Sequence, residues 1–393
     1  MSKLTYKHTV YACYLGYITQ AAVNNFAPLL FVTFHDSFGI PIEKITLLIA
    51  LNFIIQLSVD LLSAKFIDRV GYRRAVVTAH IFSAVGLAGL AVFPFAFEDT
   101  FSGLLLAVFF YAVGGGLIEV LISPIVESCP TDDKAAAMSL LHSFYCWGTV
   151  FVILVSTVVF AVAGTECWRI LACAWALLPI MTAVIFTRVP ILTLDEVEGE
   201  HISVKELLSR RIFWILVLLM VAAGASEQGM IQWASTFAES GLGVTKTVGD
   251  IVGPCLFSVL MGLARTFYAK KSESLDLLSC IIWSGALCVL SYLCAAFAPS
   301  PIMSLLGCAM CGLSVGILWP GVFSVAAVRC RGGGTALFAL LALAGDLGCA
   351  GGPSLVGFVS GTFGDSFSVG LASAVVFPVM LIICALVCRR IRD

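Results

Sequence analysis

The sequence predicts an all-α polytopic membrane protein, with twelve transmembrane helices arranged as two six-helix pseudo-repeats. Hydrophobic residues make up 60% of the 393 positions, and charged residues make up only 12%. A soluble domain is about 45–50% apolar, so this composition excludes an ordinary water-soluble fold. A spanning helix needs about 20 apolar residues, and the chain is a near-continuous series of such runs. The short alternating segments of an outer-membrane barrel are not seen in it.

We expect each span to be bounded by short polar segments. The expected limits are residues 10–34, 45–66, 75–97, 101–127, 136–163, 168–189, 213–237, 247–268, 275–298, 301–327, 334–360 and 367–388. The longest polar stretch, residues 190–212, is interpreted as a cytoplasmic linker. It divides the chain into an N-terminal six-helix half, residues 1–189, and a C-terminal six-helix half, residues 213–393.

Lysine and arginine are distributed very unevenly between the two sides of the predicted bundle. Twelve spans place both termini on the same side. Of the 22 basic residues, only Lys44, Arg169 and Lys246 fall on the opposite side, which leaves 19 on the side of the termini. Positively charged loops stay in the cytoplasm. We therefore expect a multi-pass protein of the cell (cytoplasmic) membrane with both termini cytoplasmic.

Several classes of function are excluded by what the pattern lacks. No basic stripe exists outside the short loops, so nucleic-acid binding is not expected. Most of the 15 cysteines lie in apolar runs, where thiols behave as small hydrophobes. Cys308 and Cys311 have redox-like spacing, but no His or basic neighbour lowers a thiol pKa there, so we expect them to serve packing. We find no metal-ligand cluster and no nucleophile–base pair. No enzyme activity, catalytic residue, metal or cofactor is therefore expected.

The two halves resemble weak copies of each other. The same glycine-to-proline spacing separates Gly116 from Pro124 and Gly312 from Pro320, and each member of the second pair lies 196 residues after the first. Arg69 and Arg265 are related by the same offset. Internal repeats of six spans are a transporter architecture in which the substrate site lies near the midplane at the repeat interface. The expected partners are a small-molecule substrate and the lipid bilayer, and we expect the monomer to be the working unit.

Acidic residues inside apolar runs are the first candidates for function. Asp60, Glu119, Glu227 and Asp346 have this position, and an ionisable group in hydrocarbon costs roughly 2.5–3.5 kcal/mol on insertion scales. A carboxyl group in a low-dielectric cavity binds and releases protons closer to neutral pH. We assign proton coupling to Glu119, Glu227, Asp346 and His142. For Glu119, Glu227 and His142 the alternative is a hydrogen bond or contact that serves helix packing alone, and for Asp346 it is pairing with a cation on the substrate or on another helix.

Polar faces on several spans are the candidates for binding the solute. Amides at helical spacing occupy the first, second and seventh spans, and amides hydrogen-bond hydroxyl groups while an indole covers apolar C–H faces. The alternative is helix–helix contact or simple filling of the bundle. The substrate-binding candidates are Gln20, Asn24, Asn25, Asn52, Gln56, Tyr145, Gln228, Gln232, Trp233 and Trp319.

A short charged segment between the second and third spans carries a family resemblance. It reads Asp68-Arg69-Val-Gly71-Tyr72-Arg73-Arg74 and resembles the cytoplasmic signature of the major facilitator superfamily, although Ala64 stands where that signature begins with Gly. The resemblance implies the major facilitator fold and a cytoplasmic latch that stabilises one conformation. Asp60 fits either this latch or the cavity. The expected latch residues are Asp60, Asp68, Arg69, Gly71, Arg73, Arg74 and Arg265.

A narrower resemblance covers most of the chain. The segments Leu117–Pro124, His142–Gly148 and Ala223–Trp233, together with Trp319-Pro320 and Gly351-Gly352-Pro353, are similar to motifs of the fucose/galactose/glucose–proton symporters. Ser123 replaces the asparagine of the fourth-span motif. Asn25 replaces the first-span aspartate, so a hexose specificity does not follow.

Together these observations predict a secondary active transporter. We expect it to move a small polar organic solute, sugar-like, by alternating access in symport with protons. One alternative is a proton-coupled efflux antiporter for amphipathic or cationic compounds, in which Asp60 and Asp346 would recognise the charge. Another is a non-transporting sensor or scaffold of the same fold.

Overall fold

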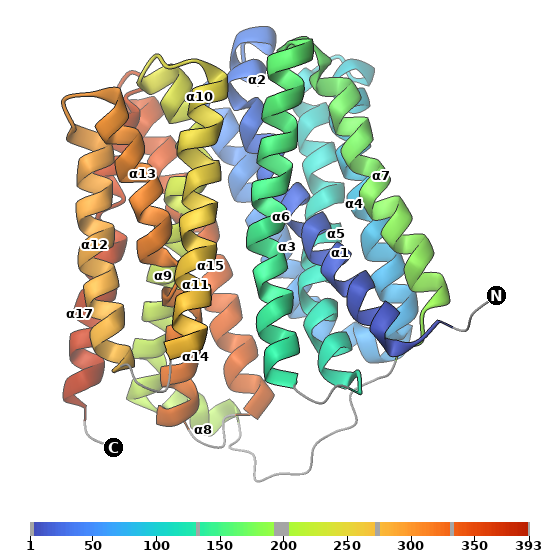
Figure 1. Ribbon diagram of the computed structural model, residues 1–393, viewed down its shortest axis with the longest axis vertical. Helices are drawn as coiled ribbons and strands as arrows, with labels where there is room; N and C mark the ends of the chain where they lie inside the picture. Colours follow the sequence, from blue (N-terminus) through green and yellow to red (C-terminus); the bar gives the residue numbers. More distant parts are fainter. Residues whose placement is uncertain (1–3, 131–133, 192–203, 272–275, 331–333, 392–393) are drawn as a thin grey trace. The chain divides into compact units, whose positions relative to one another are not determined.

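Every regular element in the described part of the chain is a helix (Figure 1). The computed structural model describes all residues except 1–3, 131–133, 192–203, 272–275, 331–333 and 392–393. A helix satisfies its own backbone N–H and C=O groups, which is the condition for crossing the hydrocarbon of a bilayer. The predicted all-α membrane class is confirmed.

The chain divides into two compact units. The first comprises Met1–Ile40 with Leu51–Glu196, and the second comprises Pro41–Ala50 with Val197–Asp393. The helices of the first unit are α1 (Tyr6–Asn25), η1 (Ala27–Leu30), α2 (Phe31–Phe38), most of α3 (Ile42–Val70), α4 (Tyr72–Ala96), α5 (Thr100–Ser128), α6 (Lys134–Ala163), η2 (Thr165–Cys167) and α7 (Trp168–Arg188).

The second unit contains the start of α3 and every helix from α8 onward. These are α8 (Val204–Ser209), α9 (Arg211–Thr236), η3 (Phe237–Gly241), α10 (Lys246–Asp250), η4 (Ile251–Cys255), α11 (Leu256–Lys271), α12 (Leu277–Phe297), α13 (Pro301–Val315), α14 (Leu318–Arg329), α15 (Gly334–Thr362), α16 (Phe367–Ser373) and α17 (Val376–Arg390). The segments η3 and η4 are π-helical, and such wide turns are frequent near functional sites.

Eleven segments of the described chain are long and apolar enough to cross a membrane. They coincide with the second to twelfth predicted spans, from Ile42–Leu62 to Phe367–Arg390. The first predicted span is interrupted: α1 passes into η1 at Pro28 and then into α2. Buried polar side chains, among them Gln20, Asn24 and Asn25, lower the apolar character of α1. With α1 as the first span, the protein has the twelve-helix fold that the sequence predicts.

The same packing pattern occurs in both units. In the first, α4 packs mainly on α5 and α7, while α1 packs on α6 and α5. In the second, α12 packs on α13 and α17, while α9 packs on α15, α14 and α13; α9 also packs on α17, as α1 packs on α7 in the first unit. Counted as spans, these are equivalent neighbours. The pseudo-repeat is therefore a repeat of helix packing as well as of sequence.

A close approach at glycine distinguishes one equivalent helix pair from the other. A Cβ atom on Gly348 of α15 would lie 2.0 Å from the carbonyl oxygen of Val221 on α9. A Cβ atom on Gly148 of α6 would lie 3.1 Å from the Cβ atom of Ala21 on α1. Small residues let helix backbones meet in membranes. The α9–α15 contact is thus backbone against backbone, and the α1–α6 contact leaves more room.

Candidate functional site

Five of the predicted site residues form one hydrogen-bonded network in the first unit, which we call the amide cluster: Gln20 and Asn24 on α1, Asn52 and Gln56 on α3, and Glu119 on α5. The Nε2 atom of Gln56 donates to Asn24 Oδ1 at 2.8 Å and to Asn52 Oδ1 at 2.9 Å. Asn52 Nδ2 donates to the same Asn24 oxygen at 3.2 Å. Gln20 Nε2 donates to Gln56 Oε1 and to Glu119 Oε2, both at 3.1 Å. The sequence identified the amides by their spacing and Glu119 as an acid inside an apolar run, and the structure joins them.

Local helix geometry explains why these side chains meet. Gln20 and Asn24 are four residues apart on α1, and Asn52 and Gln56 are four apart on α3, so each pair lies on one face. On α5 the run Gly114–Gly116 precedes Glu119. A Cβ atom on Gly115 would lie 2.9 Å from Gln20 Oε1. The glycines therefore let α5 approach closely enough to bring Glu119 to the amides.

The amide cluster has the chemistry of a polar binding surface. Its four amides are buried, with Gln20 and Gln56 each 2% exposed, while Glu119 is half-buried. Buried Gln20 Oε1 has no hydrogen-bond partner among the described residues. A buried acceptor without a partner is costly, so it is a natural place for a donor from a ligand or a water molecule. The cluster can offer both donors and acceptors to hydroxyl groups and a carboxyl group to a proton.

Asn25, His142 and Tyr145 lie in the same unit but make other contacts. Asn25 Nδ2 donates to the Ala21 carbonyl at 2.9 Å and to Thr149 Oγ1 at 3.3 Å. The exposed His142 ring lies 5.4 Å from the Tyr17 ring, between centroids. Tyr145 is half-buried on α6. The described hydrogen bonds of the Asn25 amide group thus go to Ala21 and Thr149, not to the amide cluster. The bond to Thr149 joins α1 to α6.

Tyr17 connects His142 to the fourth-span motif. Its hydroxyl group and Ser123 Oγ form a hydrogen bond of 2.9 Å. Ser123 is the residue that replaces the asparagine of the family motif. Tyr17 was not among the predicted site residues, because a tyrosine in an apolar run gives no signal of its own. Its position shows that Ser123 faces α1.

A second row of polar side chains runs along α9 in the other unit. Arg265 Nη2 on α11 lies 3.3 Å from Glu227 Oε2, an ion pair inside the spanning segments. Gln228 Nε2 donates to Glu227 Oε1 at 3.4 Å, and Gln232 Nε2 donates to Gln228 Oε1 at 3.0 Å. Glu227, Gln228 and Gln232 are all buried. Thus the predicted C-terminal residues also form a chain, and it includes a cation.

Trp233, Trp319 and Asp346 differ in how far they remain open to a ligand. Trp233 is fully buried and donates its indole N–H to the Pro353 carbonyl at 2.9 Å. This hydrogen bond is part of the contact between α9 and α15. Trp319 is half-buried, and its ring covers Gly345, where a Cβ atom would lie 2.3 Å from Cη2. Asp346, 6% exposed, follows Gly345 on α15. This geometry favours a packing role for Trp233.

The predicted latch residues occupy several different settings. Gly71 has φ of 86° and makes the turn between α3 and α4, as its position in the signature predicts. Arg73 donates to the carbonyl groups of Phe186 at 2.7 Å and Val189 at 2.8 Å, so it caps the C-terminal end of α7.

The remaining latch residues are described only in part. Arg74 is exposed at the start of α4, and Asp60 is half-buried on α3. Arg265 contacts Glu227, as described above. The side chains of Asp68 and Arg69 lie outside the described part of the chain. The latch is therefore still a prediction.

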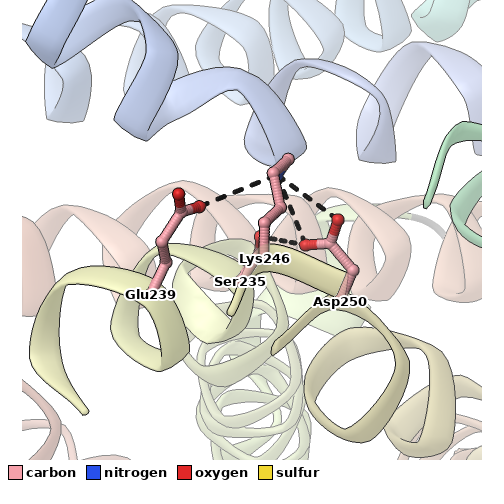
Figure 2. Close-up of polar contacts among 4 residues, drawn as sticks. All are labelled: Ser235, Glu239, Lys246 and Asp250. Atoms are coloured by element: carbon pink, nitrogen blue, oxygen red, sulfur yellow. Dashed lines mark hydrogen bonds and ion pairs between the residues drawn. The ribbon is translucent and has the colours of Figure 1, made fainter. Parts of the chain in front are cut away.

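One charged cluster was not identified from the sequence. Figure 2 shows Lys246 on α10 between two carboxylates: its Nζ atom lies 3.3 Å from Asp250 Oδ2 and 3.9 Å from Glu239 Oε2. Ser235 Oγ donates to Asp250 Oδ1. The Asp250 side chain is 0% exposed. The available signal was the i, i+4 spacing of Lys246 and Asp250 at the edge of an apolar run.

No group of three or more His, Cys, Asp or Glu residues in the described chain is placed to hold a metal ion. The two cysteines with redox-like spacing, Cys308 and Cys311, are fully buried on α13. Cys311 Sγ lies 3.9 Å from Cys288 Sγ, and all cysteines are free thiols. The thiols pack between α12 and α13 in the way small apolar groups do.

Comparison with known proteins identifies the family. The chain matches the Major Facilitator Superfamily over residues 13–353. No curated protein matches it in sequence. Its fold is similar to a bacterial homologue of the human lysosomal transporter Spinster, with 15% identity, 99% of this chain and 98% of that chain covered, and a TM-score of 0.75.

Two sugar transporters have the same fold. One is the E. coli fucose:proton symporter, with 15% identity, 98% of this chain and 99% of that chain covered, and a TM-score of 0.66. The other is the xylose transporter of E. coli in a partially occluded inward-open conformation, with 14% identity, 99% and 98% coverage, and a TM-score of 0.76. At this level of identity the likeness establishes the fold.

Proposed function

Because this chain belongs to the major facilitator superfamily, we propose that it is a secondary active transporter that carries a small, sugar-like polar solute in symport with protons. Membership of this superfamily makes it a multi-pass membrane transporter. The amide cluster of the first unit is the single observation that carries the proposal. It presents four buried amides and one carboxyl group in a continuous network.

The composition of the amide cluster favours a polyhydroxylated solute. Each amide offers two N–H donors and a carbonyl acceptor, and each sugar hydroxyl both donates and accepts. The unpartnered Oε1 of Gln20 supplies a ready acceptor. The fucose:proton symporter of E. coli has a similar fold, which supports the same solute class. Sugar-like solutes therefore fit this surface better than apolar ones.

Glu119 is the proposed proton site. It is half-buried and accepts a hydrogen bond from Gln20, which in turn donates to Gln56. Protonation of Glu119 would remove the cost of enclosing a charge when the transporter closes. The same event changes the carboxyl group from an acceptor into a donor. Proton binding and the arrangement of the amides are linked in this way.

The test is proton-driven uptake in proteoliposomes by the Glu119→Gln variant. We expect accumulation of a transported sugar to be abolished while sugar exchange without a gradient continues, because glutamine keeps the hydrogen bond but carries no proton. Glu98→Gln, at an exposed carboxyl group of the same unit, is the matched control and should accumulate sugar normally. Unchanged accumulation by Glu119→Gln would refute the assignment.

A proton-coupled antiporter for cationic or amphipathic compounds is the second candidate. Asp346 is buried next to Gly345, on which the Trp319 ring lies, and an acid beside an aromatic ring suits an organic cation. The direction of proton flow separates the candidates. Solute added outside the vesicles makes the outside more alkaline in symport, whereas in antiport it releases protons from an acidified lumen. No flux of any solute in a broad panel, under a verified proton gradient, would favour a sensor or scaffold.

We further propose that the protein works as a monomer in the cell membrane, with both termini and the segment 190–212 on the cytoplasmic side. The distribution of lysine and arginine supports this orientation. Protease accessibility of terminal tags in intact cells and in inverted vesicles checks it. Cleavage of either tag in intact cells would reverse the assignment.

A further inference from the structure

A transporter of uncharged solutes has no need of a charged pair within its spanning helices, yet Glu227 and Arg265 form one. Both residues lie within spanning segments, Arg211–Gly241 and Lys246–Tyr268. The Arg265 side chain is 21% exposed and the Glu227 side chain 7%. An arginine stays charged under all ordinary conditions, so this place in the bundle always holds a cation that needs an anion.

The pair is longer than the shortest arginine contacts in the described part of the chain. Arg265 meets Glu227 through one nitrogen at 3.3 Å. Arg73 makes two contacts at 2.7 and 2.8 Å with the end of α7, and Arg210 meets Glu206 at 2.9 Å. Charge-assisted bonds of full strength are about 2.7–2.9 Å and, for arginine and a carboxylate, often two-pronged. The Glu227 carboxylate is therefore a loosely held occupant of the guanidinium.

The groups beyond Glu227 extend this position into a polar row. Gln228 contacts Glu227 at 3.4 Å and Gln232 contacts Gln228 at 3.0 Å. From Glu227 to Gln232 the helix rises roughly 7 Å, close to the length of a five- or six-carbon chain. The row thus pairs an anion-binding group at one end with amides suited to hydroxyl groups along the rest.

We propose that Arg265 is an anion subsite in which Glu227 holds the place of a solute carboxylate, so that the transported solute is a polyhydroxylated compound bearing one carboxylate group. This rests on the proposed function and narrows it from sugars in general to sugar acids. When such a solute arrives together with a proton, its carboxylate displaces Glu227 from the guanidinium, the displaced Glu227 carboxyl group takes up the proton, and the hydroxyl groups of the solute bond Gln228 and Gln232. Arg265 is the specificity-determining residue.

The experiment compares D-glucuronate with D-glucose, which differ by a carboxylate in place of a hydroxymethyl group. Binding is measured by ligand-induced thermal shift and by counterflow in proteoliposomes of the full chain. We expect wild type to prefer glucuronate by about tenfold or more, because only glucuronate can replace the 3.3 Å contact of Glu227 with a shorter, two-pronged contact to the guanidinium. Glu227→Gln, which frees the guanidinium, should strengthen glucuronate binding several-fold and leave glucose binding unchanged.

The double variant Glu227→Gln/Arg265→Gln removes both charges of the pair, and it should lose the preference for glucuronate. Arg210→Gln, at the exposed pair with Glu206, is the matched control and should keep the preference. Equal binding of the two solutes by wild type, or a preference retained by the double variant, would overturn the subsite. If glucose is transported without any preference for glucuronate, the inference fails and the proposed function stands. If neither solute moves or binds, both fail.

Discussion

The two units place their polar residues in equivalent helices but combine them differently. In the first unit, Glu119 reaches from α5 to amides on α1 and α3 and accepts its bond from a neutral partner, Gln20. In the second, Glu227 lies on α9 itself and contacts the cation Arg265. The first arrangement is a network across three helices, and the second is a row along one helix with a charge at its end.

This difference shows how a duplicated fold can divide the work of a transporter. A carboxyl group that accepts a hydrogen bond from an amide can take up a proton and still have a neutral partner, which suits the proposed proton site at Glu119. A carboxyl group bonded to arginine is neutralised and is better suited to exchange with another anion. The packing repeats between units, and the chemistry of the polar positions does not.

The largest effect is expected where a charge loses its partner. Arg265→Gln leaves the buried Glu227 carboxylate without its cation, and breaking a buried pair in this way costs about 3–5 kcal/mol. We expect the purified variant to melt well below wild type in a thermal unfolding assay. The double variant with Glu227→Gln should recover most of the loss. A single variant as stable as wild type would show that the pair contributes no electrostatic stabilisation.

The next effect tests the closer packing of the second unit. Gly348→Ala places a Cβ atom 2.0 Å from the Val221 carbonyl oxygen, so α9 and α15 must move apart. In the equivalent helix pair of the first unit, Gly148→Ala brings a Cβ atom no closer than 3.1 Å to Ala21. Overpacking costs about 1–3 kcal/mol and more when a backbone must shift, so Gly348→Ala should destabilise the protein clearly more. Equal melting temperatures would contradict the asymmetry.

The network of the first unit should depend on Gln56 more than the row of the second depends on Gln228. Gln56→Leu removes the bonds to Asn24, Asn52 and Gln20, and leaves their buried polar atoms unpaired at a cost of about 1–3 kcal/mol. Gln228→Leu breaks the contacts to Glu227 and Gln232. We expect a larger loss of thermal stability for Gln56→Leu. The reverse order would show that the network is not a cooperative unit.

The smallest effect compares the helix caps of equivalent spans. Asp99 accepts from the backbone N–H groups of Phe101 at 3.3 Å and Ser102 at 3.1 Å, and from Ser102 Oγ at 2.6 Å, at the start of α5. Ser300 accepts from Met303 N at 3.4 Å at the start of α13. Loss of a good N-cap costs about 1 kcal/mol, so Asp99→Ala should lower the melting temperature slightly and Ser300→Ala less. A larger shift for Ser300→Ala would contradict this ranking.

Much of the candidate site could be predicted from spacing alone. Gln20 with Asn24 and Asn52 with Gln56 each repeat after four residues, and a polar face on an apolar helix must point away from lipid. That pattern was enough to select the four amides as candidates and to place each pair on one helix face. It could not show that Arg265 pairs with Glu227, because 38 residues separate them and their meeting depends on how α9 and α11 pack. Lys246 and Asp250 were missed for a different reason: they lie at the edge of a run, where charges are ordinary.

The sequence by itself determined the membrane class, the positions of the spans and the residues that carry polar chemistry. The reason is that burial in hydrocarbon is costly for a backbone group outside a helix and for a polar side chain without a partner. Only the tertiary structure decided which of those residues meet. Contacts between helices depend on side-chain shape and on backbone approach at positions such as Gly115 and Gly348. Those distances are set by the packing of the whole unit, and no periodicity along the chain encodes them.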